Sequence, residues 1–292
     1  MALAEASLGQ LTPIFVEKAL GDQVAPELER QHGGVDPDPR IAEYVAWVGR
    51  KLLPFSKRGQ DPHVYKVLRS EKIINAFALG NGNVYVTRGL LNLIQDEAEL
   101  AEILGHENGH YGLRHIAKQI DWGIGTSSLL AVSTAIYMSI KGDKLSEKDK
   151  ERMQAASEII PTLILNGFGR DQELEADQHG LDTMVRAGYD PMGAVSIFQR
   201  FQKLEPEVQG LDVFFRSHPT AKIRISDLEA RIRRRYPNVT GERFADRYQS
   251  IVHGTSSVSD ETRILPGIPD EVLYIGGGIM LAGGVVAVLL SL

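Results

Sequence analysis

Two histidines lie four residues apart in the stretch HENGH, residues 106–110. If this stretch is helical, the rings of His106 and His110 project from one side of the helix, and their nitrogens can reach a single zinc ion. Glu107 lies beside them, where it could take a proton from a water molecule at that ion. The pattern HExxH therefore predicts a zinc site with Glu107 as general base. The alternative is a pair of hydrogen-bonded core histidines.

The helix that would carry this motif has a clear beginning. Asp96 is placed to cap it, and Glu99 follows three residues later, as in a capping box. An apolar face then leads into His106 and His110; its members are Leu100, Ile103 and Leu104. Gly109 costs roughly 1 kcal/mol relative to alanine inside a helix, but it lets a neighbouring element approach closely. We therefore expect the motif on the buried side of a helix.

A third ligand must come from another segment. Catalytic zinc usually has three protein ligands and one open position. The chain has no cysteine, so the ligands must be His, Asp or Glu. The longer pattern HExxHxxGxxH would place a histidine at position 116, where the chain has Ile116, and His115 is one residue short. This spacing excludes the longer pattern.

A second predicted helix, which begins in the stretch RDQELEADQHG at residues 170–180, offers two carboxylates. Its apolar stripe consists of Leu174, Leu181, Met184 and Val185. Asp177 falls inside this stripe and Glu173 on its border, whereas Glu175 falls on the opposite side. A carboxylate inside an apolar stripe is costly unless something pairs with it. We therefore predict that Glu173 is the third zinc ligand and that Asp177 accepts the N–H of a ligand histidine. The alternative is an acidic pair that caps the helix or forms ion pairs.

The remaining elements predict an α+β protein that is mostly helical with a small sheet. Three segments are predicted strands: residues 63–70, 74–79 and 83–87. Gly80, Asn81 and Gly82 should join the last two as a hairpin. Residues 1–53 are predicted to be helical with a break at 33–39, and most of the chain after the sheet is predicted to be helical.

Composition narrows the class of partner. The chain has 292 residues, of which 43% are hydrophobic and 24% charged, so it can bury a sizeable core. Its net charge of −6 argues against nucleic acid as the main partner. The absence of cysteine excludes disulfides, thiolate metal sites and cysteine nucleophiles.

The domain organisation is predicted from the ends of the chain. Residues 1–253 should form the catalytic domain, and the first residues show no signal peptide. Residues 254–271 are polar and rich in turn formers, which indicates a linker. Residues 272–292 then contain a run of 20 uncharged residues, so we expect a single C-terminal membrane helix, with a buried terminal helix as the alternative. Residues 123–140 also lack charge, and we expect them to lie on a membrane or to cover a cleft.

Several motifs of the sequence together resemble those of a known family. The stretch HENGHYGLRH, followed by ELEAD at 173–177, is similar to metallopeptidase family forty-eight, the gluzincin group that includes the CAAX prenyl endopeptidase, HtpX and BepA. NAFALGNGNVYVTRGLL at 75–91 and SHPTAKIRI at 217–225 match two further family segments in the family order. The resemblance covers residues 20–235. It departs at Asn108, which is usually apolar in the family, and in the GNG turn, which replaces Pro-Gly-Gly.

The resemblance implies a zincin-like fold that binds one zinc ion per chain, with Glu173 as the third ligand and His115 as a non-ligand. It implies a zinc-dependent endopeptidase acting on polypeptides in membrane-associated protein quality control. Its edge strand would bind substrate as an added strand near Asn75, Ala76 and Phe77. His218 would either stabilise the oxyanion or occupy the open position of zinc and hold the enzyme latent; its alternative is a packed loop residue.

Two other functions stay open at this stage. The first is a membrane-tethered chaperone or assembly factor that binds unfolded chains without cutting them. The second is a structural zinc site, which would normally be closed by four ligands. The presence of Glu107 beside the ligands favours the peptidase, because a protein that only binds needs no general base.

Overall fold

The computed structural model describes residues 11–254, except 143, 149, 152–153, 155–166, 205–207 and 220, and also residues 272–275 and 278–281. The described helices are α2 (Ile14–Gln31), α3 (Pro39–Leu52), η1 (Leu53–Phe55), α4 (Arg88–Leu93), α5 (Glu97–Gly112), α6 (His115–Lys141), α8 (Arg170–Arg186), α9 (Met192–Leu204), α10 (Leu211–Ser217), α11 (Ala221–Arg235) and α12 (Ala245–His253). The described strands are β1 (Val64–Leu68), β2 (Ala76–Ala78), β3 (Asn83–Thr87), β4 (Val272–Ile275) and β5 (Gly278–Leu281). The predicted α+β class, mostly helical with a small sheet, is confirmed.

The three-stranded sheet has the order β1-β3-β2, with β1 parallel and β2 antiparallel to the central strand β3. All three strands lie within the predicted segments. The predicted hairpin joins β2 to β3: Leu79 N donates to Asn83 O at 2.8 Å, and Gly82 has a φ of 89°, a left-handed conformation that glycine adopts without steric cost. This arrangement leaves β2 at one edge of the sheet.

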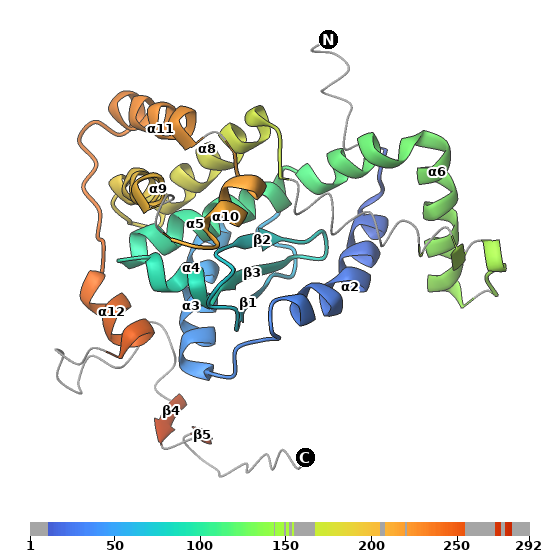
Figure 1. Cartoon of the computed structure of the whole chain (residues 1–292), viewed down its shortest axis with the longest axis horizontal. Helices are drawn as coiled ribbons and strands as arrows, with labels where there is room; N and C mark the ends of the chain where they lie inside the picture. Colours follow the sequence, from blue (N-terminus) through green and yellow to red (C-terminus); the bar gives the residue numbers. More distant parts are fainter. Residues whose placement is uncertain are drawn as a thin grey trace. The chain divides into compact units, whose positions relative to one another are not determined.

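Helix α5, which carries HENGH, lies at the centre of the domain and packs against α3, α8, α9 and β2 (Figure 1). Asp96 caps it as predicted, since its side chain accepts from Glu99 N at 3.0 Å. Glu99 reaches back to Gln95 N at 2.9 Å, one residue before the cap. Residues 97–111 are all buried, so the helix is surrounded by protein. The sequence pattern predicted a single buried face and understated this burial.

Glycines let α5 and α8 approach closely. A Cβ atom on Gly105 would lie 3.0 Å from Gly180 Cα, and one on Gly109 would lie 3.1 Å from Ala176 Cα. Either contact is tighter than ordinary packing allows. The glycine inside HENGH therefore brings the two predicted ligand helices together, at the expense of some helix propensity.

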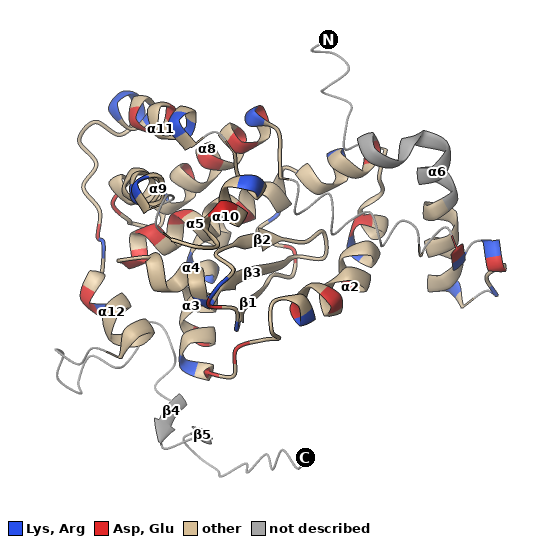
Figure 2. Cartoon of the chain, in the orientation of Figure 1, with Lys and Arg blue, Asp and Glu red and all other residues tan. Residues whose placement is uncertain are grey.

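The apolar segment 123–140 lies within α6. Its described side chains Val132 and Ile136 are buried in a hydrophobic cluster that includes Val16 and Leu20 of α2. Tyr137 and Ile140 on the same helix are exposed. The segment therefore packs one side against α2. The charged residues after α6, visible as blue and red in Figure 2, are largely exposed, as expected for a solvated segment.

The chain divides into two units, Met1–Gly254 and Thr255–Leu292. Residues 255–271 of the predicted linker lie outside the described residues. In the second unit, β4 and β5 form an antiparallel pair in which Val272 faces Leu281. The sequence predicted one helix over residues 272–292, whereas the structure has two strands within residues 272–281. The local sequence explains this: glycines at 276–278 disfavour helix, and β-branched and aromatic neighbours favour strand. Among the described helices, none combines the length and apolar character that a membrane span requires.

Candidate metal centre

Four buried side chains converge where α5, α8 and the end of α10 meet. One donor atom from each of His106, His110, Glu173 and His218 lies within 4.8 Å of the others. The two predicted histidines come from consecutive turns of α5, with their Nε2 atoms 2.9 Å apart. Glu173, in the first turn of α8, places Oε1 3.3 Å from His110 Nε2 and Oε2 3.7 Å from His106 Nε2. The structure thus brings together the three predicted ligands.

The donor set fits zinc. Two imidazoles and one carboxylate, with a further position beside them, are a known ligand set of catalytic zinc. Within the described part of the chain, the oxygens of Glu173 are buried without a hydrogen-bond partner, although Arg224 Nη1 forms an ion pair with Oε2 at 2.8 Å. A buried carboxylate in this state is stabilised by a cation. One zinc ion held by His106, His110 and Glu173 would supply it.

Asp177 lies where the sequence predicted, one turn after Glu173 on α8. Its Oδ1 is 2.9 Å from Nδ1 of His106, which leaves Nε2 of that ring facing the other ligands. Arg224 of α11 donates twice to the same carboxylate, from Nε to Oδ2 at 2.8 Å and from Nη2 to Oδ1 at 2.6 Å. Asp177 therefore fixes the orientation of the His106 ring, and Arg224 fixes Asp177.

Charge compensation sets the pKa values of these groups. Burial raises the pKa of Asp177, but Arg224 and His106 outweigh it and hold the pKa below its usual value. For Glu173, burial is again outweighed by Arg224 and His218, and the pKa lies well below the usual value. Both carboxylates are therefore charged at neutral pH, as a zinc ligand and its supporting acceptor must be.

Arg224 is a residue of this site that the sequence motifs did not predict. This arginine is fully buried, and it repeats with Leu228 and Ile232 at helical spacing on the inner face of α11. A charged residue inside an apolar stripe was the signal that identified Asp177, and it would have identified Arg224 too. Its guanidinium also lies over the ring of Phe198, 4.2 Å from the centroid.

Glu107 faces the same space from α5. Its Oε1 is 3.6 Å from His218 Nε2, and its Oε2 is buried with no hydrogen-bond partner among the described residues. Burial raises the pKa of Glu107, an effect partly offset by His218 and His106. A carboxylate with a raised pKa and a free oxygen has the properties of a general base.

His218 follows α10 and is buried at the centre of the cluster. Its Nδ1 is 3.3 Å from His106 Nε2 and 3.4 Å from Glu173 Oε1, so it faces the same point as the three predicted ligands. Its Nε2 lies 3.2 Å from Ala76 O on the edge strand β2. Burial lowers the pKa of His218, but Glu173 and Glu107 raise it by more.

The edge strand predicted to bind substrate lies beside this cluster. Asn75 precedes β2, and its Oδ1 accepts from Ser217 Oγ at 3.0 Å. Phe77 is buried and stacks on Tyr85, with centroids 4.9 Å apart, so its side chain belongs to the core. Ser217 and His218 therefore lie along the part of β2 that was predicted to bind substrate.

Two further aromatic rings contact His110. Phe168, just before α8, stacks on it with centroids 3.8 Å apart. His115, at the start of α6, places Nδ1 2.8 Å from His110 Nδ1. The sequence excluded His115 as a ligand, and the structure places it on the far side of the His110 ring from the cluster. Phe168 carries no motif, so sequence reasoning had no signal for it.

The predicted stripe of α8 needs correction. Leu174 and Val185 are half-buried. The buried face is rotated and contains Glu173, Ala176, Asp177, His179, Gly180, Leu181, Thr183 and Met184. This face is half polar because it meets α5 through small residues and carries the site. The rotation moves Glu173 from the border to the buried face.

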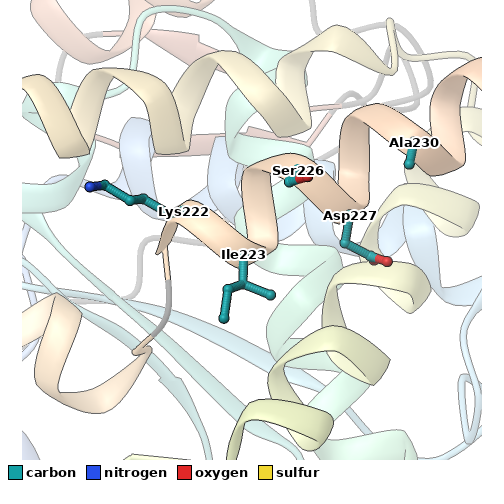
Figure 3. Close-up of a pocket in the computed structure, with 5 residues that line it drawn as sticks. All are labelled: Lys222, Ile223, Ser226, Asp227 and Ala230. Atoms are coloured by element: carbon teal, nitrogen blue, oxygen red, sulfur yellow. The ribbon is translucent and has the colours of Figure 1, made fainter.

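The surface pocket in Figure 3 is separate from this centre. It is lined by Lys222, Ile223, Ser226, Asp227 and Ala230, all from α11. The candidate ligands are absent from its lining. Arg224 lies on the inner side of the same helix, so α11 contributes to the metal centre from one face and to this pocket from the other.

Comparison with known proteins supports the same assignment. Residues 39–232 match Peptidase family M48. Mitochondrial metalloendopeptidase OMA1 of Arabidopsis thaliana is 34% identical over 155 residues, which are 53% of this chain and 29% of that relative. Metalloprotease LoiP of Escherichia coli K12 is 29% identical over 215 residues, 74% of this chain and 80% of that relative. The beta-barrel assembly-enhancing protease of Yersinia pestis is 25% identical over 238 residues, 80% of this chain and 47% of that relative.

The chain thus spans less than half the length of two of these three relatives. The family match nevertheless covers more than half of the chain and contains all four clustered residues. The resemblance read from the sequence motifs is confirmed. The chain therefore belongs to peptidase family M48, and its first unit is a metallopeptidase domain.

Proposed function

We propose that this protein is a zinc-dependent endopeptidase that hydrolyses peptide bonds in polypeptide substrates. The observation that carries the proposal is the buried cluster of His106, His110 and Glu173 with Glu107 beside it. A structural zinc site needs no neighbouring carboxylate with an unpartnered oxygen, and a chaperone needs no general base. Peptide hydrolysis requires both the metal-binding cluster and a neighbouring general base.

The roles of the residues follow from their positions. His106, His110 and Glu173 would hold the zinc ion, which would act as a Lewis acid on the scissile carbonyl and lower the pKa of water. Glu107 accepts the proton of the attacking water and delivers it to the leaving amine. Asp177 and Arg224 keep the ring of His106 oriented. The substrate adds to β2 as an extra strand, at the backbone groups of residues 75–77.

In the arrangement seen here His218 is proposed to hold the enzyme latent. Its Nδ1 faces the three ligands and its Nε2 lies 3.2 Å from Ala76 O, a carbonyl that an added strand could use. The same side chain would thus fill the fourth position of a zinc ion bound there, and it contacts a backbone carbonyl at the edge of β2. Substrate would have to displace His218 before it could bind productively.

His218→Ala separates latency from oxyanion stabilisation. If His218 holds the enzyme latent, the variant cleaves an unfolded substrate faster than wild type and loses zinc sooner, because a fourth ligand is gone. If it stabilises the oxyanion, kcat falls about 10²–10³-fold and zinc content stays the same. A variant that matches wild type in both rate and zinc content would leave His218 as a packing residue.

Membrane association through the uncharged tail is proposed as the cellular setting, in protein quality control. The support is the sequence of residues 273–292, which carries no charge. Deletion of residues 270–292 should move the protein from the membrane fraction to the soluble fraction with peptidase activity retained. A full-length protein that is soluble without detergent would contradict this part of the proposal.

The main test is degradation of casein by the purified protein, with and without a chelator, together with metal analysis. We expect one zinc per chain and proteolysis that the chelator abolishes. The matched variant is Glu107→Gln, which should keep its zinc. Its rate of hydrolysis should fall by about 10²–10⁴-fold, the contribution of a general base. Unchanged turnover in this variant would reject the mechanism. Substrate binding without cleavage by the wild-type protein would support the chaperone alternative.

A further inference from the structure

His110 has a partner on the side of its ring that faces away from the metal centre. His115 is fully buried, and its Nδ1 lies 2.8 Å from His110 Nδ1. The two rings are nearly perpendicular, with centroids 4.9 Å apart. The other nitrogen of His115, Nε2, lies 3.1 Å from Oε2 of Glu175 on α8. Glu175, His115 and His110 therefore form a continuous line from the surface to the centre.

The protons along this line have a single consistent assignment. If His110 binds zinc through Nε2, its neutral ring must carry its proton on Nδ1. The 2.8 Å contact holds one proton, so Nδ1 of His115 must accept it. A neutral His115 then carries its own proton on Nε2, where Glu175 accepts it. Each ring nitrogen and the receiving carboxylate oxygen has one role in this arrangement.

Local backbone geometry places His115 at this position. Helix α5 ends at Gly112, and Arg114 adopts a left-handed conformation with a φ of 58° before α6 begins. This conformation is uncommon for a residue with a side chain, and it lies between the last turn of α5 and the first turn of α6. Arg114 Nε donates to the buried Glu17 at 3.1 Å, which anchors the turn on α2. On the other side, Lys118 Nζ lies 3.6 Å from Glu175 and helps to hold that carboxylate near His115.

The two histidines of the motif are therefore supported differently. The Nδ1 of His106 meets the carboxylate of Asp177, which Arg224 clamps. The Nδ1 of His110 meets a second imidazole, and a carboxylate follows only behind that imidazole. Outer partners of this kind fix the tautomer and the ring orientation of a metal ligand. We infer that His115 is a positioning residue for the ligand His110 and that Glu175 in turn orients His115. This inference rests on the proposed zinc site.

Two substitutions at residue 115 give opposite orders for positioning and for packing. His115→Asn leaves a cavity, but its Oδ1 can replace the acceptor Nδ1. His115→Phe fills the space of the ring and cannot accept. If His115 positions His110, zinc transferred to a coloured chelator should leave His115→Phe about 10–100-fold faster than wild type, while His115→Asn stays close to wild type. If His115 only packs, the variant with the cavity should lose zinc faster.

A second measurement needs no variant. In long-range proton–nitrogen spectra of zinc-loaded protein, His115 should be protonated on Nε2 and bare on Nδ1. Equal zinc release from the two variants, the reverse order, or a proton on His115 Nδ1 would overturn the proposal. If either variant fails to fold, the tautomer of wild-type His115 decides. None of these readouts uses a substrate, so a protein that binds zinc but cleaves nothing overturns the proposed activity alone.

Discussion

The two ends of α5 both bury carboxylates, but they compensate the charge in different ways. At the start of the helix, Glu97 is fully buried and receives four hydrogen bonds. Arg247 donates to it from Nε and Nη2, both at 2.6 Å, while the hydroxyls of Tyr44 and Tyr189 donate at 2.8 and 2.7 Å. Lys51 adds a further positive charge at 3.8 Å. Side chains of the protein therefore compensate the buried charge of Glu97.

Further along the same helix the carboxylates lack such partners. Among the described residues, both oxygens of Glu102 and one oxygen of Glu107 are buried without a hydrogen bond, as are both oxygens of Glu173 on the facing helix. Burial is as deep as at Glu97. A buried charge alone therefore does not identify a functional site in this protein. The informative feature is a buried carboxylate that lacks donors and also belongs to a cluster of metal-binding side chains, as Glu173 does and Glu102 does not.

The largest difference between the two ends should appear in zinc content. Glu173→Ala removes a ligand and should weaken zinc binding by more than the about 10–100-fold that loss of an outer partner causes. Glu97→Gln changes an equally buried carboxylate at the other end and should keep full zinc content. Metal analysis after dialysis against a weak chelator measures both.

Glu175→Ala sharpens the same experiment. The sequence pattern placed Glu175 on the solvent-exposed side of α8, so a substitution there would be expected to leave the zinc content unchanged. The structure places it against His115, so we expect a zinc loss smaller than that of Glu173→Ala but above that of Glu97→Gln. Equal metal content in Glu173→Ala and Glu175→Ala would mean that the wrong carboxylate was chosen as ligand.

The next effect in size concerns stability at the first end of the helix. Arg247→Ala removes two donors from Glu97 and leaves a buried carboxylate with Lys51 and two tyrosines. Breaking a buried pair typically costs about 3–5 kcal/mol, and the remaining partners should keep the loss near the lower value. Urea unfolding of the zinc-loaded protein measures it, with the exposed Arg234→Ala as control. If Arg247→Ala lost zinc but kept its stability, the proposed difference between the two ends of α5 would be wrong.

Much of the metal centre could be predicted from sequence because its signals are local. His106, Glu107 and His110 lie within five consecutive residues of a capped helix, and Asp177 and Glu173 stand out as acids near an apolar stripe. The strands follow from alternating and β-branched residues around a glycine-rich turn. These features depend on nearest neighbours along the chain, which a single sequence displays.

The remaining parts depend on contacts between distant segments. Arg224 reaches Asp177 from another helix, and no local pattern states which acid it will meet. His115 meets His110 because Arg114 adopts a left-handed conformation, which its residue type does not predict. Phe168 lies in a loop and is fixed only by the rings it packs on. In the tail, hydrophobic length predicted a helix over residues 272–292, whereas residues 272–275 and 278–281 form two strands.

The smallest expected effect concerns Glu102, whose carboxyl lies between α5 and α8 near Gly180. Burial, reinforced by Asp177, raises the pKa of Glu102 well above its ordinary value of 4.5. Below pH 4.5 this group is protonated in both folded and unfolded chains and costs nothing. As the pH rises further, the unfolded chain releases the proton first, so ionisation favours unfolding until the pKa of the folded state is passed. Glu102→Gln cannot ionise and should therefore be more stable than wild type at pH 8, by about 2–4 °C in Tm for each kcal/mol relieved. The gain should shrink toward zero as both proteins are compared at pH values closer to 4.5, with zinc in excess throughout. A gain that is the same at every pH would show that ionisation of Glu102 is not what costs stability.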